Sequence, residues 1–419
     1  MDVRLSLFLT HSAGTNPEVI FAHPLTDPGG LLVSPLLLAA VAAVVIAGVA
    51  LLPSAPARST RIDAQLGLVV YSWQGSLTRP QEAVRALSVA LLVLAAAAGR
   101  FGSTDELENI APALIVGAAW PLLVAVSAAA GPVWRWLDPW DSLARIFVRS
   151  DRDEASPGLP SDVRPAAVGA LGLVWYLSAY PDTLAPRSIG LALALYTVIA
   201  LAGCLAVGRE AWLGRAEVFG LVFGWLALGP RGLLAAWQPP RGAEAVLGVL
   251  AGGLLFGAVR HSLLWGSLNI VPLATLYALA GLVASCSAAA AMLRGAGRWA
   301  ARRGAPGSVA AASLPAVAAL AVSLGMSRNR LFTSIQLLPA LAGDPFGAGW
   351  DLLGAAGVGL DPNPLGTTGR VAAQVLVLMA GHLFGAYVLT RRSAPAGRVP
   401  ATVGLCALAA AGMLAVGAV

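Results

Sequence analysis

Apolar residues along this chain gather in long, nearly uninterrupted runs that alternate with short polar segments. A run of about 20 apolar residues crosses a bilayer as an α-helix, because each residue rises about 1.5 Å and the hydrocarbon layer is roughly 30 Å thick. The pattern therefore predicts an all-α fold, a polytopic transmembrane helical bundle of about ten spans. The predicted spans are residues 31–52, 83–99, 109–130, 165–180, 187–207, 242–259, 268–293, 307–325, 371–389 and 401–419.

One apolar stretch, residues 219–229, is short and lies between charged residues at both ends. If it crossed the membrane, the bundle would have eleven spans, and the later arginine-rich loop at 294–303 would face the opposite side from the others. Treating 209–241 as a re-entrant or interfacial segment removes that conflict. We therefore prefer ten spans and keep eleven as the alternative.

Arginines between the predicted spans indicate which side each loop faces, since cytoplasmic loops are enriched in Arg and Lys. With ten spans the arginine-rich loops all fall on one side, and the acidic loop at 105–108 falls on the other. Both termini are then extracytoplasmic. Residues 1–30 form an extracytoplasmic arm, and residues 31–419 form a single helical membrane domain.

Irregular segments interrupt this domain in two further places. Residues 131–164 contain Trp134, Trp136 and Trp140 just after a span, and indole rings favour the headgroup level, so we expect a cytoplasmic interfacial helix and loop anchored by these rings. A binding surface built on Asp138 and Asp141 is the alternative. Residues 326–369 are dense in Gly, Pro and Asp and are expected to form an extracytoplasmic lid-like segment over a vestibule.

Composition agrees with a membrane protein, with 58% hydrophobic and only 11% charged residues. All 27 basic Lys and Arg residues are arginine, which excludes mechanisms that need a lysine, such as a P-loop or a Schiff base. The net charge of +6 comes from loop arginines that report topology, so no nucleic-acid partner is expected. Lipid is the expected partner, with a small-molecule substrate and membrane-complex subunits as further candidates, and no cofactor is expected.

His382 lies near the middle of the predicted span 371–389. A polar side chain at that depth normally faces the bundle interior, so it is a functional-site candidate. A structural histidine, bonded to a backbone carbonyl or to Gln374, is the alternative.

Other charged residues extend the candidate intramembrane or vestibule site. The 219–229 stretch is flanked by Arg215, Glu217 and Glu244. Transporters build substrate sites at the ends of broken helices, so these residues are candidates for such a site. Salt bridges that close a helical hairpin are the simpler interpretation. Arg328 follows a span and could pair with Asp344 or Asp351 in the lid, or attract an anion.

Catalytic and metal motifs are scarce. His11, His23 and His261 are predicted to share the outer side, but no HExxH pair or thiolate spacing identifies a metal site, so the metal stays unknown. The sequence also contains no Walker A, GxSxG or CxxCH motif. Whether the protein is an enzyme is left open, with the balance against it.

Three stretches nevertheless resemble a family of uncharacterised multi-pass membrane proteins of actinobacteria and haloarchaea, whose members often carry the name fenitrothion hydrolase. They are G-S-T-D-E-L-E-N-I-A-P with the later P-V-W-R-W-L-D-P-W, then G-D-P-F-G-A-G-W-D-L-L-G-A-A-G, and V-L-M-A-G-H-L-F-G-A-Y. The resemblance implies a bacterial plasma membrane location and organophosphate hydrolysis, and it places His382 at the family's Gly-His pair. Further family histidines are replaced here, where the chain reads S-L-G-M-S-R-N-R-L-F and A-Y-V-L-T.

Three functions follow as hypotheses. The first is a transporter or permease-like protein for a small apolar or anionic compound. The second is a structural subunit or scaffold of a membrane complex. The third is a membrane-embedded metal-dependent hydrolase, as the family name implies.

Overall fold

The computed structural model describes residues 34–52, 79–148, 162–262, 265–266, 273–357 and 359–418. The described residues are all-helical, without strands. The predicted N-terminal arm with His11 and His23, most of the loop after the first predicted span, and residues 149–161 of the loop after the third lie outside them.

Eight helices in the described part of the chain are long and apolar enough to cross a membrane. They match eight of the ten predicted spans, and the fold is a helical membrane bundle. The eight are α3 (Arg79–Phe101), the continuous π-helix η2 and α4 (Pro112–Ala119 and Trp120–Ala130), α8 (Pro186–Val207), α11 (Ala243–Arg260), α13 (Ala274–Arg302), α14 (Ser308–Gly325), α16 (Gly366–Arg392) and α17 (Pro395–Ala418).

The other two predicted spans are also helical but shorter. Helix α1 (Pro35–Leu51) has 17 residues and α7 (Arg164–Ser178) has 15, so the count of ten stays a prediction. The 219–229 stretch contains α10 (Val218–Leu226), whose nine residues extend only about 14 Å at 1.5 Å per residue. A helix of that length does not cross the hydrocarbon layer, which argues against eleven spans.

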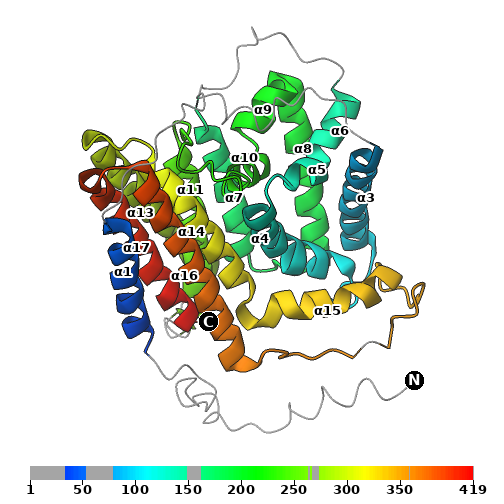
Figure 1. The fold of residues 1–419 in the computed structure, drawn as a ribbon. Helices are drawn as coiled ribbons and strands as arrows, with labels where there is room; N and C mark the ends of the chain where they lie inside the picture. Colours follow the sequence, from blue (N-terminus) through cyan, green and yellow to red (C-terminus); the bar gives the residue numbers. More distant parts are fainter. Residues whose placement is uncertain are drawn as a thin grey trace.

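Short helices occupy the two ends of the bundle (Figure 1). At one end, which we call the elbow end, lie α5 (Trp134–Leu137), α6 (Pro139–Phe147) and α9 (Arg209–Arg215). At the other, the lid end, a one-turn 3-10 helix η4 (Ser327–Asn329) leads into α15 (Arg330–Gly343), which runs across the ends of the long helices. Pro35 and Gly417 are in contact at this end, so α1 begins where α17 ends.

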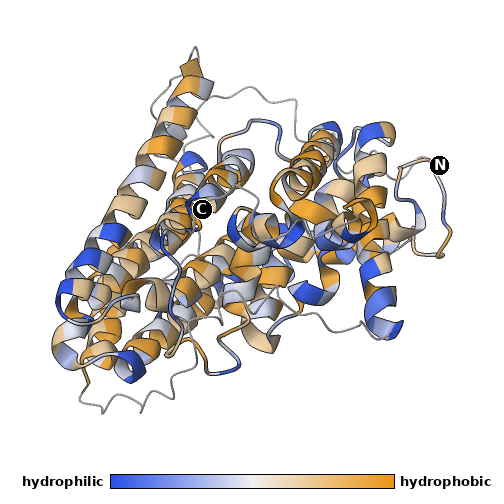
Figure 2. Ribbon diagram, turned by 90° about the horizontal axis from the view of Figure 1, so that it is seen from above, coloured by the Kyte–Doolittle hydropathy of each residue, from blue (hydrophilic) through white to orange (hydrophobic). Residues whose placement is uncertain are grey.

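Two groups of helices make up the bundle. Helices α1, α11, α13, α14, α16 and α17 pack together, and α3 packs with α8 and α6 in the second group. Helices α4, α7 and α10 join the two groups. On one side α4 packs on α14 and α7 packs on α11; on the other, η2, which continues into α4, contacts α3 and α8, and both α7 and α10 contact α9, which packs on α8. Hydrophobic residues predominate along most of the helices, as Figure 2 shows. Many large apolar side chains of α1, α3, α8 and α13 are exposed, which suits contact with lipid.

Small residues bring the backbones of neighbouring helices into direct contact, the packing mode that the Ala- and Gly-rich spans predict. A Cβ added to Gly252 of α11 would lie 2.5 Å from the Ser285 carbonyl oxygen and 2.6 Å from Cys286 Cα on α13. A Cβ at Gly381 of α16 would lie 2.5 Å from the Pro315 carbonyl oxygen on α14. Because these neighbouring atoms are backbone, no side-chain movement can make room.

We expect Gly252→Val to lower the free energy of unfolding by about 1–3 kcal/mol, because the added methyl groups force α11 and α13 apart. Thermal unfolding of the purified protein in an uncharged detergent measures the effect. Gly48→Val in α1 is the matched control, since a Cβ there meets nothing within 4 Å. Equal unfolding temperatures for the two variants would contradict this account of the packing.

Candidate functional site

Helix α10 enters the bundle through a cap built on Glu217. Its Oε1 accepts a hydrogen bond from the Phe219 backbone N–H at 3.0 Å, and its Oε2 accepts from the Gly220 N–H at 2.5 Å. The Tyr196 hydroxyl of α8 donates to the same carboxylate. Glu217 is only 2% exposed, so these donors replace the water that a surface cap would use.

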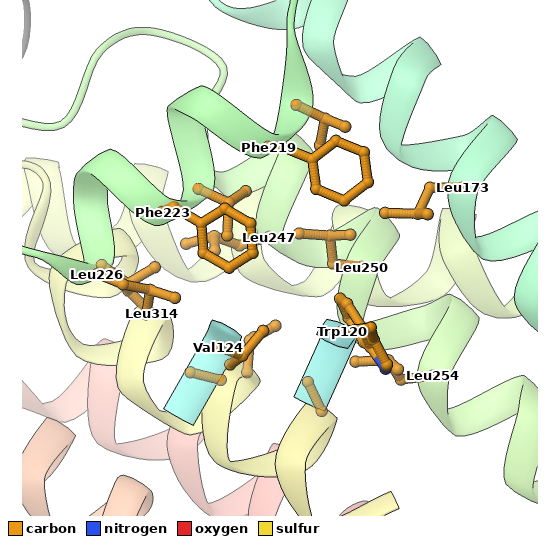
Figure 3. A pocket seen from close by; sticks show the side chains of 15 residues that line it. Trp120, Val124, Leu173, Phe219, Phe223, Leu226, Leu247, Leu250, Leu254 and Leu314 are labelled. Atoms are coloured by element: carbon orange, nitrogen blue, oxygen red, sulfur yellow. The ribbon is translucent and has the colours of Figure 1, made fainter. Parts of the chain in front are cut away.

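One face of α10 lines an apolar cavity, shown in Figure 3. Phe219 and Phe223 of α10 point toward it from one side, and Trp120 and Val124 of α4 face them from the other. The space open to the centre of a water molecule is about 30 Å³. The remaining lining residues are also apolar and come from α7, α10, α11 and α14: Leu173, Val218, Val222, Leu226, Leu247, Leu250, Leu254, Leu314, Val317, Ala318 and Ala321.

This cavity lies at the middle of the long helices rather than at an end. Its residues on α14 run from Leu314 to Ala321 in a helix that spans Ser308–Gly325, and those on α4 lie near the centre of the η2–α4 helix. The cavity therefore lies close to the midpoints of α11, α14 and the η2–α4 helix.

An aromatic layer separates this cavity from the elbow end. The Trp134 ring lies 4.7 Å from Phe223, the Trp140 ring stacks on Phe219 at 5.3 Å, and Tyr196 meets Trp140 edge to face at 4.7 Å. Trp134 and Trp140 are 7% and 6% exposed, which corrects the expectation that they anchor the chain in the headgroups. Their rings hold α10 in place, and Trp136, at 44% exposed, is the one of the three tryptophans that faces outward.

The two aspartates of the elbow have structural partners. Asp138 caps α6 by accepting from the Trp140 and Asp141 backbone N–H groups. Asp141 binds Arg85 of α3 at 2.6 Å, Arg209 of α9 at 2.6 Å and Arg145 at 3.1 Å. Burial acts to raise the pKa of Asp141, but the three arginines, Arg145 first, hold this pKa below its usual value. The carboxylate therefore ties three helices together.

His382 is 1% exposed and lies on the face of α16 that packs into the bundle. Its Nδ1 donates to the Leu378 carbonyl at 2.7 Å, in agreement with the structural alternative, while Nε2 is buried without a partner among the described residues. Gln374 bonds Arg370 and the Ser323 carbonyl instead of His382. His382 does not line the cavity.

The other predicted site residues are dispersed over the bundle. Glu244, in the first turn of α11, faces α13, where a Cβ on Gly297 would lie 3.1 Å from its Oε1. Arg215 is half-buried in the last turn of α9. No hydrogen bond or ion pair in the described chain joins any two of the predicted site residues, so the expected single site is not assembled from them.

The lid carboxylates serve the lid itself rather than Arg328. Asp344 accepts from the backbone N–H groups of residues 348–350, and Asp351 accepts from those of Ala355 and Ala356. The lid is docked through the Ser103 N–H, which donates to the Phe346 carbonyl at 2.7 Å. Arg328 donates to the His261 carbonyl at 3.3 Å, so it is oriented by α11 and not by the lid.

Among the described residues, no three His, Cys, Asp or Glu side chains come close enough to hold a metal ion. Sequence reasoning missed the cavity, because an apolar residue that lines a void has the same type as one that packs a core. Tyr196 was also missed, since nothing in α8 signals that its hydroxyl reaches Glu217.

The described fold places the chain in the class of helical membrane proteins, with eight helices of spanning length. Comparison with protein-family models, with curated proteins and with solved structures gives no match.

We expect Asp141→Asn to lower the free energy of unfolding by about 3–5 kcal/mol, because it leaves buried arginines without their counter-charge. In the wild type this stabilisation is complete above pH 3.8, the ordinary pKa of the group, and is lost as the pH falls through the lowered folded-state pKa. Unfolding of the variant should lack that acid transition.

Glu210→Gln is the control for Asp141→Asn. Glu210 lies 3.5 Å from Arg209 of the same cluster but is 47% exposed in its side chain, so its loss should cost at most about 1 kcal/mol. A larger effect for Glu210→Gln than for Asp141→Asn would refute the role of Asp141.

Proposed function

We propose that this chain is a permease-like membrane protein that binds a small apolar compound in the cavity between α10 and α14. The observation that carries the proposal is the cavity itself, which lies at the middle of the bundle and has apolar walls from five helices. Ligand sites in helical bundles are built between helices in this way.

The walls favour an apolar compound over an anionic one. An ion or strongly polar group moved into an apolar cavity loses its hydration without gaining hydrogen bonds, which costs several kcal/mol. An apolar compound of suitable size gains dispersion contacts with the lining rings and leaves no unsatisfied group.

The 209–241 segment supports movement as well as binding, and we take it as re-entrant. Its flanks are held at the elbow end, where Arg209 binds Asp141 at 2.6 Å and the Arg241 carbonyl accepts from the Val163 N–H. Between them, α10 reaches the middle of α14 and stops after nine residues. Discontinuous helices of this kind form substrate sites in transporters.

We expect Ala318→Leu to abolish or weaken, by at least about tenfold, the binding of xenon, because the longer side chain occupies the cavity (tenfold is about 1.4 kcal/mol). Xenon NMR in detergent micelles, with and without the protein, measures binding. Filling a cavity adds packing contacts, so the unfolding temperature should not fall with the loss of binding.

Ala284→Leu on the exposed face of α13 is the matched control and should bind as the wild type does. Transport is tested in energised cells by the steady-state accumulation of radioactive xenon against cells without the protein. The wild type and Ala284→Leu should change accumulation and Ala318→Leu should not. If xenon binds but none of the three proteins changes its accumulation, the permease proposal is wrong.

A further inference from the structure

A cluster of cationic side chains lies at the lid end, away from the cavity. Arg260 and His261 end α11, and Arg328 and Arg330 lie at the junction of α14 with α15. The hydrogen bond from Arg328 Nη2 to the His261 carbonyl, 3.3 Å long, joins the two pairs. Arg260 is oriented by hydrogen bonds to the Ser178 and Tyr180 carbonyls. The end of α11 and the α14–α15 junction thus bring four basic residues close together.

No carboxylate in the described part of the chain forms an ion pair with these arginines. Glu106 acts on Arg330 only at longer range, and the lid aspartates already bind backbone N–H groups. The arginines around Asp141 share that carboxylate, whereas Arg392 and Arg398 donate to backbone carbonyls. Among the described residues, the lid-end cluster therefore differs from the Asp141 cluster in having no carboxylate at its centre.

The nearby positive charges help to lower the pKa of two members of the cluster, His261 and Arg330. Partial burial first, and then Arg328, Arg260 and Arg330, lower the pKa of His261 to about 4, so this imidazole is neutral at pH 7. Burial, followed by the nearby Arg328, also lowers the pKa of Arg330, with Glu106 acting in the opposite direction. An anion placed among these groups would relieve both effects.

The backbone at Arg328 is a second, independent observation. Arg328 has φ of +55° and ψ of 29°, and it is the non-glycine residue with positive φ in the described chain. That conformation costs an L-residue with a side chain about 1–2 kcal/mol, a cost that glycine avoids. Glycine would suit this position better, and the neighbouring residues are already cationic. A requirement for the Arg328 guanidinium, such as binding an anion, would explain why an arginine is found here.

We infer that Arg328 and Arg330, with Arg260 and His261 beside them, form a binding site for a phosphate-type oxyanion. The planar guanidinium presents paired N–H donors that match two phosphate oxygens, and neutral His261 can donate one more hydrogen bond. The oxyanion can be a free phosphate or the headgroup of an anionic lipid, which share this chemistry. The site does not depend on the cavity or on the permease proposal.

The side of the membrane adds to the argument. The sequence predicts that the lid end is extracytoplasmic, where arginines are normally sparse. Several arginines on that side, with no carboxylate partner among the described residues, run against this tendency, and a bound anion would account for them.

The test uses the full-length protein in an uncharged detergent and follows thermal unfolding as ligand is added. Inorganic phosphate is compared with chloride at equal ionic strength, and short-chain phosphatidylglycerol is compared with an uncharged diacylglycerol of the same chain length. We expect phosphate or phosphatidylglycerol to raise the unfolding temperature of the wild type. Arg328→Gln and Arg330→Gln should each weaken the apparent affinity at least about tenfold, the effect of losing a charge-assisted hydrogen bond.

Arg187→Gln is the matched control, because it removes an exposed arginine from the first turn of α8 at the same end but outside the cluster. It should bind as the wild type does. Arg328→Gly separates binding from folding: it should raise the unfolding temperature of the unliganded protein by relieving the positive-φ strain, and yet bind the oxyanion more weakly.

A response to phosphate identifies a soluble anion, and a response to phosphatidylglycerol alone identifies a lipid headgroup; either supports the site. The inference is overturned if neither ligand shifts the unfolding temperature, or if Arg328→Gln, Arg330→Gln and Arg187→Gln all bind alike.

Discussion

The structure depends on how the first N–H groups of α10 are satisfied inside an apolar bundle. A helix begins with backbone N–H groups that lack intrahelical partners, and no bulk water is available to them at this depth. Glu217 accepts two of these groups and is itself fixed by Tyr196 from α8. The helix can therefore begin within the bundle, and its aromatic residues meet Trp134 and Trp140, which the Asp138 cap and the Asp141 ion pairs hold at the elbow.

Close packing elsewhere explains why space is left beside this helix. Glycines such as Gly252 and Gly381 bring α11, α13, α14 and α16 into backbone contact, so these helices form a rigid unit. Helix α10 turns one apolar face toward α4, α11 and α14 across the cavity. The cavity is thus the gap left between this face and long helices whose separation is already fixed.

Most of the helices can be predicted from the apolar runs and their lengths, because a membrane span depends on the local composition of the chain. Eight predicted spans are helices of spanning length, and 219–229 proved to be too short to span. The roles of side chains were harder to predict, because they depend on distant partners. From the sequence, Trp134 is predicted to lie at the membrane interface, but in the structure α10 covers its ring. Asp344 is predicted to pair with Arg328, but it accepts hydrogen bonds from the backbone of the lid instead. The sequence could place His382 in the bundle interior. It could not show whether the imidazole forms a hydrogen bond with a backbone carbonyl, as it does with that of Leu378, or with Gln374.

The places where this chain departs from the most stable arrangement are informative, since sequences that only had to fold would remove them. A larger residue at Ala318 would fill the cavity, and glycine at position 328 would remove the backbone strain there. The cavity at Ala318 is lined by apolar side chains, and the strained backbone at Arg328 lies among guanidinium groups. Because an apolar void disfavours a charged ligand and a cationic cluster favours one, the two places cannot serve the same part of a ligand. On the two proposals, an apolar ligand and an oxyanion would therefore bind at separate places along the axis of the bundle.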